Sequence, residues 1–370
     1  MKTIFGYVDR EALSRINSKE EASGEDDKNK NEAIRQVLEE AGKILKEGGL
    51  VAFPTETVYG LGADGLNQEA SKKIYAAKGR PSDNPLIIHI TNMKDLEKIV
   101  EEIPQAARIV AEKYWPGPLT MIFKKADCVP YGTTGGLDTV AVRMPSDEVA
   151  GAVIDAGGGY IAAPSANTSG RPSPTTAAHV KEDLDGKIDM ILDGGPVDIG
   201  VESSILDVTV DPPMILRPGA ITKEMLEDLI GQVAIDQTLI KPDSKVTPKA
   251  PGMKYRHYAP KADLTIFEGD MEEVVARING LVTEQLALGK RVGIIATKET
   301  EGRYLSGADI KVAGTRENEA TIANRLYGIL REFDEDQVDF IYSESFDREG
   351  IGSAIMNRLL KAAGHHVEQV

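Results

Sequence analysis

Short apolar segments alternate with amphipathic ones along most of this chain, and Pro or Gly stands at nearly every junction between them. Short apolar runs bounded by turn residues are typical of strands, and apolar residues three to four positions apart are typical of helices. Many short strands with irregular connections favour a mixed, twisted α/β sheet over a regular parallel one. Strands are predicted over residues 86–90, 119–123, 139–143, 160–163, 190–192, 204–208 and 214–216. Helices are predicted over 68–77, 94–100, 104–114, 146–156, 175–184 and 222–229.

The N-terminal region is predicted to hold a strand within residues 1–10 and then, over 15–31, a polar loop or mobile linker. A helix follows, because apolar residues from Ile34 to Leu45 recur at helical spacing and two glycines then end the pattern. We therefore predict that residues 1–31 are a strand with a linker, and that the first α/β domain spans 32–230.

Residues 231–261 lose this periodicity and contain four prolines, which predicts an interdomain linker. Beyond them strands and helices alternate regularly, in the pattern of a smaller three-layer, Rossmann-like α/β domain over 262–370. Its strands are predicted over 264–267, 292–296, 309–313 and 338–342, and its helices over 271–289, 317–332 and 351–362.

Length, charge and cysteine content narrow the class of protein. A chain of 370 residues suggests two domains, at roughly 150 residues per domain. The 43 basic against 59 acidic residues give a net charge of −16, which argues against broad binding of a nucleic-acid backbone. The single Cys128 excludes an internal disulfide and a thiolate metal cluster. Charges within MKTIFGYVDREALSR and the lack of a long apolar run predict a cytoplasmic protein without a membrane partner.

Arginines lie next to, or close to, Pro or Gly at the ends of four predicted elements, at Arg80, Arg143, Arg171 and Arg217. Ligands of α/β sheets bind at the carboxyl ends of strands, and Arg pairs in a bidentate manner with carboxylate or phosphate. Together these arginines favour one site for an anionic ligand. Lys78 and Arg80 also fit a second explanation, since a helix C-terminus attracts cations.

Three further motifs have both a functional and a purely structural interpretation. Thr55, Glu56 and Thr57 leave an apolar strand and enter a Gly-rich turn, where the threonine hydroxyls either contact a polar ligand or cap the turn. His89, in LIIHI, is either a ligand contact or a core histidine. The segment from Ser165 to Asn167 follows a strand and is suited to a nest of amides around phosphate oxygens.

The predicted linker itself contains PGMKYRHYAP, residues 251–260, in which cations and tyrosines stand between prolines. This composition suits either a flap over a nucleotide or a plain linker. The glycines at 60, 62 and 65 match dinucleotide spacing, but no apolar helix starts within the pattern. A phosphate-binding loop and paired metal-ligand histidines are also absent from the sequence. The residues alone therefore indicate an ATP- or phosphate-using cytoplasmic enzyme.

At these positions the sequence resembles the threonylcarbamoyl-AMP synthase family, which is built on the YrdC-like domain. The additional C-terminal domain and the PGMKYRHYAP segment make it similar to the long form of that family. The resemblance rests on PTETVYGLGA (54–63), KGRPSDNPLIIHI (78–90), WPGPLT (115–120), GLDTVAVRMP (136–145), APSANTSGRPSPT (163–175), GVESSILDV (200–208) and ILRPG (215–219).

The resemblance implies that L-threonine, bicarbonate and ATP with Mg²⁺ give threonylcarbamoyl-adenylate and pyrophosphate. A partner machinery would then pass the threonylcarbamoyl group to the adenosine next to a tRNA anticodon. The family's catalytic signature falls on Lys78, Arg80, Ser165 and Asn167, and no metal ligated by protein residues is expected. Threonine would meet Thr57, His89, Arg143, Ala163 and Ser203. ATP would meet Arg80, Asn84, Thr139, Ser165, Ser173, Arg217 and Tyr258.

Two alternative functions also follow from this domain type. A non-catalytic RNA-binding module would need a continuous basic surface, which the net charge of −16 disfavours, so RNA is expected as a weak partner at most. A carbamoyl-transferase maturation module would carry a fused zinc finger or acylphosphatase domain, and the single cysteine excludes the zinc finger.

Overall fold

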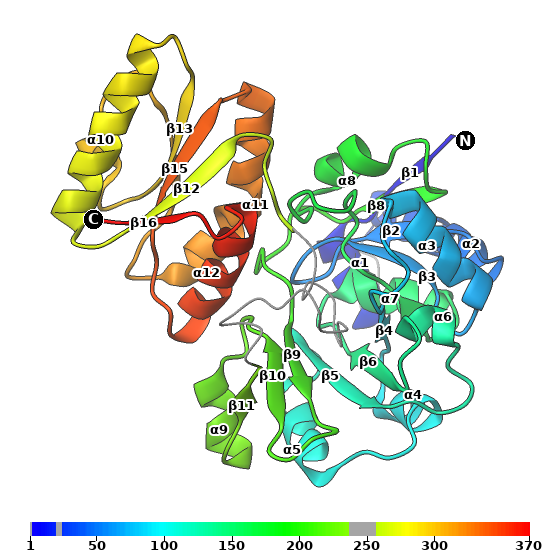
Figure 1. Cartoon of the computed structure of the whole chain (residues 1–370). Coiled ribbons are helices and arrows are strands. Elements are labelled where there is room, and N and C mark those ends of the chain that lie inside the picture. The colour runs from blue at the N-terminus through cyan, green and yellow to red at the C-terminus, as the bar shows by residue number, and fades with distance from the viewer. Residues whose placement is uncertain (1, 20–23, 237–256) are drawn as a thin grey trace. The chain divides into compact units, whose positions relative to one another are not determined.

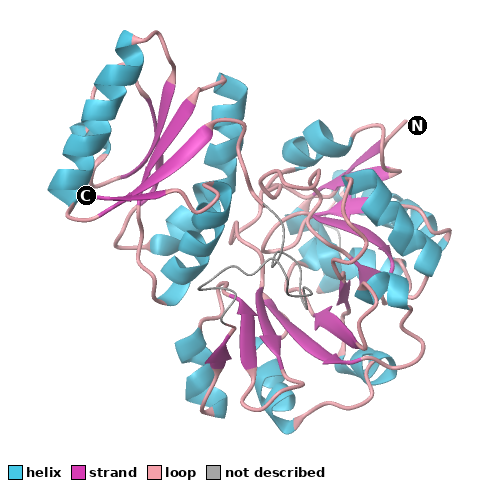
Figure 2. Ribbon diagram, in the orientation of Figure 1, coloured by secondary structure: helices cyan, strands magenta, loops and turns pink. Residues whose placement is uncertain are grey.

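The structure is a computed structural model that describes residues 2–19, 24–236 and 257–370 (Figure 1). The chain forms two compact units, each with its own sheet (Figure 2). The first unit holds most of residues 1–254, and the second holds 255–370 together with two short stretches, Gly170–Ser173 and Ile199–Val201. No helix in the described ranges has the length and apolar content needed to cross a membrane.

A single mixed sheet organises the first unit, and its described strands run in the order β1-β8-β2-β3-β7-β4-β6-β5-β9-β10-β11. Parallel and antiparallel pairs alternate irregularly, so the prediction of a mixed sheet is confirmed. The strands are β1 (Ile4–Tyr7), β2 (Val51–Phe53), β3 (Gly60–Asp64), β4 (Ile87–His89), β5 (Leu119–Lys124), β6 (Thr139–Arg143), β7 (Ile161–Ala162), β8 (Met190–Asp193), β9 (Ser204–Asp207), β10 (Met214–Arg217) and β11 (Ala234–Ile235).

Helices cover this sheet and form three buried clusters with it. One cluster joins α1, α2 and α7 to β2, β7 and β8, a second joins α3 and α8 to β2 and β3, and a third joins α4, α5 and α9 to β4, β5, β6, β9 and β10. The helices are α1 (Arg10–Asn17), α2 (Glu25–Lys46), α3 (Gln68–Lys78), α4 (Met93–Ile99), α5 (Gln105–Tyr114), α6 (Tyr131–Thr134), α7 (Glu148–Ala156), α8 (Ala177–Leu184) and α9 (Lys223–Ile230).

The polar stretch 15–31 was predicted as a loop or linker, and this prediction is wrong where the structure describes it. Helix α1 continues to Asn17, and α2 already begins at Glu25. The first turn of α2 carries three acidic residues, which the positive end of a helix dipole favours, so its polar composition is compatible with a helix. Strand β1 pairs with β8, and Arg10 forms an ion pair with Asp147 at the start of α7. The N-terminal segment is therefore part of the first unit.

Strand β3 was missed because its glycines suggest a turn. It pairs in antiparallel fashion with β2, with Gly62 opposite Val51. A Cβ atom at Gly62 would lie 2.6 Å from the ring of Phe53, so this glycine is required for close packing. Two of the three glycines with dinucleotide spacing thus belong to a strand, which excludes the nucleotide turn that the spacing suggested.

The second unit is a regular α/β domain, as predicted. Its five described strands are all parallel, in the order β14-β13-β15-β12-β16. Figure 1 shows α10 on one face of this sheet and α11 and α12 on the other. The elements are β12 (Asp263–Glu268), α10 (Met271–Ala287), β13 (Val292–Thr297), β14 (Asp309–Gly314), α11 (Glu319–Asp336), β15 (Phe340–Glu344), α12 (Gly350–Ala362) and β16 (Val367–Gln369).

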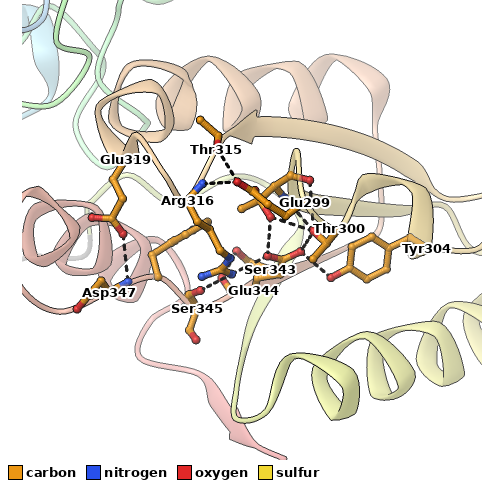
Figure 3. A network of polar contacts seen from close by, with 12 residues as sticks. Glu299, Thr300, Tyr304, Thr315, Arg316, Glu319, Ser343, Glu344, Ser345 and Asp347 are labelled. Atoms are coloured by element: carbon orange, nitrogen blue, oxygen red, sulfur yellow. Dashed lines mark hydrogen bonds and ion pairs between the residues drawn. The ribbon is translucent and has the colours of Figure 1, made fainter.

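The buried carboxylate of Glu344, the last residue of β15, connects two loops at the carboxyl ends of these parallel strands (Figure 3). It accepts hydrogen bonds from the hydroxyls of Thr300 and Tyr304, the latter at 2.8 Å, and both residues follow β13. Its other oxygen lies 2.7 Å from Nη2 of Arg316, which follows β14. A buried carboxylate is stable only when paired and hydrogen-bonded, so this network fixes the loops after β13 and β14 to the end of β15.

The linker predicted over 231–261 is described only at its ends. Its first residues form β11, which pairs in parallel with β10. Residues 237–256, which include most of the predicted flap, lie outside the described residues.

Candidate active site

Three neighbouring strands of the first unit place one polar side chain each in a row. The register of the sheet pairs His89 of β4 with Arg143 of β6, and Arg143 with Thr120 of β5. The intervening residues Val142 and Met121 belong to the hydrophobic core on one face of the sheet. Because side chains alternate along a strand, the three polar residues point to the opposite face. All three are less than 5% exposed.

Ser203 and Arg217 extend this row across β9 and β10. The hydroxyls of Thr120 and Ser203 lie 2.8 Å apart. Arg217 donates from Nη2 to the Ser203 hydroxyl at 3.1 Å and from Nε to the Ser203 carbonyl at 3.0 Å. The row therefore holds two buried guanidinium groups, with hydroxyl groups between them.

The loop after β2 contributes a second set of polar groups beside Arg143. Nη1 of Arg143 donates to the hydroxyl of Thr57 at 2.9 Å, and this hydroxyl lies 2.9 Å from that of Thr55. Oε2 of Glu56 lies 2.8 Å from Nη2 of Arg143, and both side chains are at most 7% exposed. A hydroxyl and a carboxylate thus hold the guanidinium on the site face of the sheet.

Burial and charge set the protonation of the groups around Arg143. Burial by itself would raise the pKa of Glu56, but the Arg143 charge and hydrogen bonds from Arg143 and from the backbone of Glu56 and Ser146 together outweigh it, so the pKa lies below its usual value. Burial, with a smaller contribution from the Arg143 charge, lowers the pKa of His89 to about 3. The imidazole is therefore neutral. Its Nδ1 lies 3.1 Å from the carbonyl oxygen of Ile87, which can only accept, so the proton is on Nδ1.

A second polar cluster surrounds the end of α3. Gly79 adopts φ +61° and ends the helix with its amide bonded to the carbonyl of Ala76, which leaves Lys78 in the last turn. Nζ of Lys78 donates to the carbonyl oxygens of Ser165 and Asn167, the latter at 2.5 Å, and to the Asn167 side chain at 3.3 Å. The buried ammonium thereby holds the segment after β7 in one conformation.

These two clusters suit two kinds of ligand. A guanidinium, a neutral imidazole and several hydroxyls on a buried face can bind a small molecule with a carboxylate and a hydroxyl group. The segment after β7 consists of small residues and is fixed by Lys78, which is close in sequence to Arg80. Such a segment is suited to binding phosphate oxygens.

Comparisons with known proteins bear on both clusters. A family model for Sua5, YciO and YrdC proteins, described as telomere recombination, matches residues 43–219, and one for the threonylcarbamoyl-AMP synthase C-terminal domain matches 221–364. The threonylcarbamoyl-AMP synthase of Bacillus subtilis is 51% identical over 331 residues, which cover 89% of this chain and 94% of the relative. The chain belongs to the threonylcarbamoyl-AMP synthase family. The synthase of Pyrococcus abyssi is 47% identical, over 91% of this chain and 98% of its own.

A solved structure agrees with this membership. The crystal structure of Pyrococcus abyssi Sua5 complexed with L-threonine matches this chain with a TM-score of 0.88 and 43% identity, and covers all of both chains. The mixed sheet followed by a parallel one is thus the architecture of the long-form threonylcarbamoyl-AMP synthases.

The structure brings together the residues to which the family resemblance assigns threonine binding. Thr57, His89, Arg143 and Ser203 are linked through the contacts described above, and Ser203 joins them through Thr120. Ala163 lies beside them, because its amide donates to the carbonyl of Ile87 at 2.9 Å. Their individual roles stay predictions.

The predicted ATP residues of the first unit fall into separate places. Lys78, Ser165 and Asn167 form the cluster at α3, and Arg80 donates to the carbonyl of Asn84 at 3.3 Å. Arg217 ends the row across the sheet. Thr139 starts β6, four residues from Arg143, so it stands about 13 Å away along the strand.

Ser173 and Tyr258 belong to the second compact unit. The ring of Tyr258 packs against that of Tyr327 in α11, with 5.1 Å between their centroids. Tyr258 is 5% exposed and has a φ of +64°. The rest of the predicted flap, residues 251–256, lies outside the described residues.

Thr120 and Glu56 were not assigned a role from the sequence, although both touch predicted threonine-site residues. A signal for Thr120 exists, because it is the only polar residue inside the apolar run LTMIF and falls on the strand face opposite the core residues Leu119 and Met121. Glu56 lies in a polar motif, and the ligand contact predicted for this motif was given to its threonine hydroxyls. Its contact with Arg143 is a tertiary one, which spacing along the chain does not reveal.

The low pKa of His89 predicts a measurable dependence of stability on pH. Below pH 6.5 the unfolded chain protonates this histidine, while the folded protein does not until about pH 3. The free energy of unfolding should therefore decrease as the pH is lowered from 6.5 towards 3. His89 should account for about 2 kcal/mol of the loss between pH 7.5 and 5. Urea unfolding at both pH values would test this, since His89→Gln should show a smaller loss. An equal loss in both proteins would contradict a neutral His89.

Proposed function

We propose that this protein condenses L-threonine, bicarbonate and ATP into threonylcarbamoyl-adenylate with release of pyrophosphate, since its relatives are named for the synthesis of this product, threonylcarbamoyl-AMP. The observation that carries the proposal is the buried row from His89 through Arg143 and Thr120 to Ser203. It offers a guanidinium and hydroxyl groups on one sheet face of a chain that belongs to this family.

The threonine end of the site is proposed from the chemistry of these groups. The carboxylate of threonine pairs with Arg143, whose Nη1 Thr57 already holds in place. The neutral His89 leaves Nε2 as an acceptor for the threonine hydroxyl. The solved structure of a relative contains L-threonine, which supports this use of the buried row.

The ATP end is proposed from the cations and small residues of the second cluster. Lys78, Ser165 and Asn167 shape the phosphate cradle, while Arg80 and Arg217 supply guanidinium groups. Within the described ranges no group of three His, Cys, Asp or Glu side chains could hold a metal ion. Mg²⁺ would therefore arrive with the phosphates of ATP, and bound water would fill most of its coordination sphere.

The proposed chemistry joins anions, so positioning and charge neutralisation carry most of it. The neutral amine of threonine attacks the bicarbonate carbon, and loss of water gives the carbamate. A carbamate oxygen then attacks the α-phosphorus of ATP, and the bond to pyrophosphate breaks. A tRNA-modifying enzyme would consume the product, and the cytoplasm is the proposed compartment.

Pyrophosphate release from ATP and Mg²⁺ tests the proposal when L-threonine and bicarbonate are omitted in turn. Release that needs both substrates is the expected result. A folded protein that binds ATP but releases no pyrophosphate under any combination would overturn it. Tight binding of RNA by that same inactive protein would favour the RNA-binding alternative.

A further inference from the structure

The buried pair of Glu56 and Arg143 has hydrogen-bonding capacity that the described part of the chain uses only in part. Both carboxylate oxygens of Glu56, and Nε and Nη2 of Arg143, are buried, and the contacts of the carboxylate with the guanidinium and with the backbone amides of Glu56 and Ser146 fall short of full hydrogen-bond geometry. Oε2 and Nη2 are nevertheless only 2.8 Å apart. Buried polar atoms normally find partners, so this pair is prepared for a ligand that supplies them.

The geometry of the guanidinium shows which ligand group fits. Thr57 occupies Nη1, and the opposite edge, Nε with Nη2, is the edge that can take a carboxylate in a bidentate manner. A carboxylate there would lie beside Glu56, so two negative charges would share one guanidinium in a buried place. Like charges disfavour each other strongly where solvent does not screen them.

Among the described residues, the other groups near Glu56 do not supply a compensating charge. His89 is neutral, because burial lowers its pKa to about 3. Arg10 is already paired with Asp147, and Arg217 is bonded to Ser203 further along the row. A positive group carried by the ligand itself would balance Glu56.

We infer that Glu56 is a specificity-determining residue that makes the pocket select an amino-acid zwitterion over a plain carboxylic acid. The ligand's carboxylate pairs with Arg143, and its ammonium group lies against Glu56. This inference rests on the proposed function and deepens it. Before the amine reacts, the ammonium must transfer a proton to solvent and become the neutral nucleophile. This step ends its charge pairing with Glu56.

The test compares threonine with 3-hydroxybutanoate, which lacks only the amino group. Calorimetric binding to the full-length protein measures both ligands without depending on turnover. We expect the wild-type protein to prefer threonine by about 100-fold, and Glu56→Gln to reduce this preference at least about tenfold. Threonine should bind more weakly to the variant, and 3-hydroxybutanoate more tightly. Glu56→Asp, which keeps the charge, should retain most of the preference.

Glu344→Gln is the matched control, because it removes another buried glutamate from an ion pair with an arginine, in the second unit, and it should leave the preference unchanged. If Glu56→Gln weakened the binding of both ligands equally, Glu56 would have only a structural role. That result would overturn the inference but not the proposed function. Failure of the wild-type protein to bind threonine at all would overturn the proposed function and the inference with it. Thermal unfolding of each variant verifies that the binding data come from folded protein.

Discussion

Replacing Arg143 with alanine is expected to lower kcat/KM for threonine by about 1,000-fold, or about 4 kcal/mol of transition-state binding. Arg143 is 4% exposed, and its guanidinium contacts Thr57 and Glu56. Water therefore cannot easily replace it. Pyrophosphate release at varied threonine concentration measures the effect. Arg143→Lys should recover little of it, because an ammonium cannot present two parallel donors to a carboxylate.

The same substitution should also destabilise the fold, because it leaves the buried Glu56 without a counter-charge. Breaking one side of a buried pair costs about 3–5 kcal/mol. Glu56→Gln in the Arg143→Ala background should therefore restore most of the stability and none of the activity. Restored activity in the double variant would show that Arg143 acts only by neutralising Glu56, and would contradict direct binding of threonine.

Lys78→Met is expected to be the second most damaging change, with activity lowered by at least about 100-fold. Lys78 is 2% exposed, and its ammonium donates to the carbonyls of both Ser165 and Asn167, so its loss leaves buried acceptors without a donor. Each such acceptor costs about 1–3 kcal/mol. We expect the segment after β7 to lose its shape, and KM for ATP to rise more than KM for threonine.

Lys73→Met provides the control for this prediction. Lys73 lies on the same helix, and its Nζ also donates to a backbone carbonyl, that of Gly48, but it contacts neither site cluster. Its replacement should leave both Michaelis constants unchanged. A rise in KM for threonine alone after Lys78→Met would contradict the role of Lys78 in the phosphate cradle.

The strands that build the candidate site could be predicted because their sequences are short, apolar and bounded by Pro or Gly. Residues 139–143 were predicted as a strand, and they form β6. The position of Arg143 at its carboxyl end followed from that strand alone. Which strands become neighbours could not be predicted, because the paired residues of β4 and β6, such as His89 and Arg143, are 54 positions apart and register depends on tertiary packing.

The predictions for β3 and for the start of α2 failed for the same physical reason. In both segments composition suggested one structure, whereas tertiary contacts stabilise another. The glycines of β3 suggested a turn, yet Gly62 is needed so that the sheet can pack closely against Phe53. The polar start of α2 suggested a linker, yet the helix buries only one stripe, from Ile34 to Leu45, and the remainder is solvated. The partner of Glu56 likewise became known only when the fold brought Arg143 to it.

The pairing of β1 with β8 has a consequence for the solution behaviour of shortened forms of this protein. Met190, Ile191 and Leu192 in β8 are fully buried, and β1 supplies the hydrogen bonds along their outer side. A chain that began after α1 would expose this apolar strand as an open sheet edge. The first seventeen residues therefore keep a fully buried strand from becoming the edge of the sheet, the position from which strands pair with other molecules.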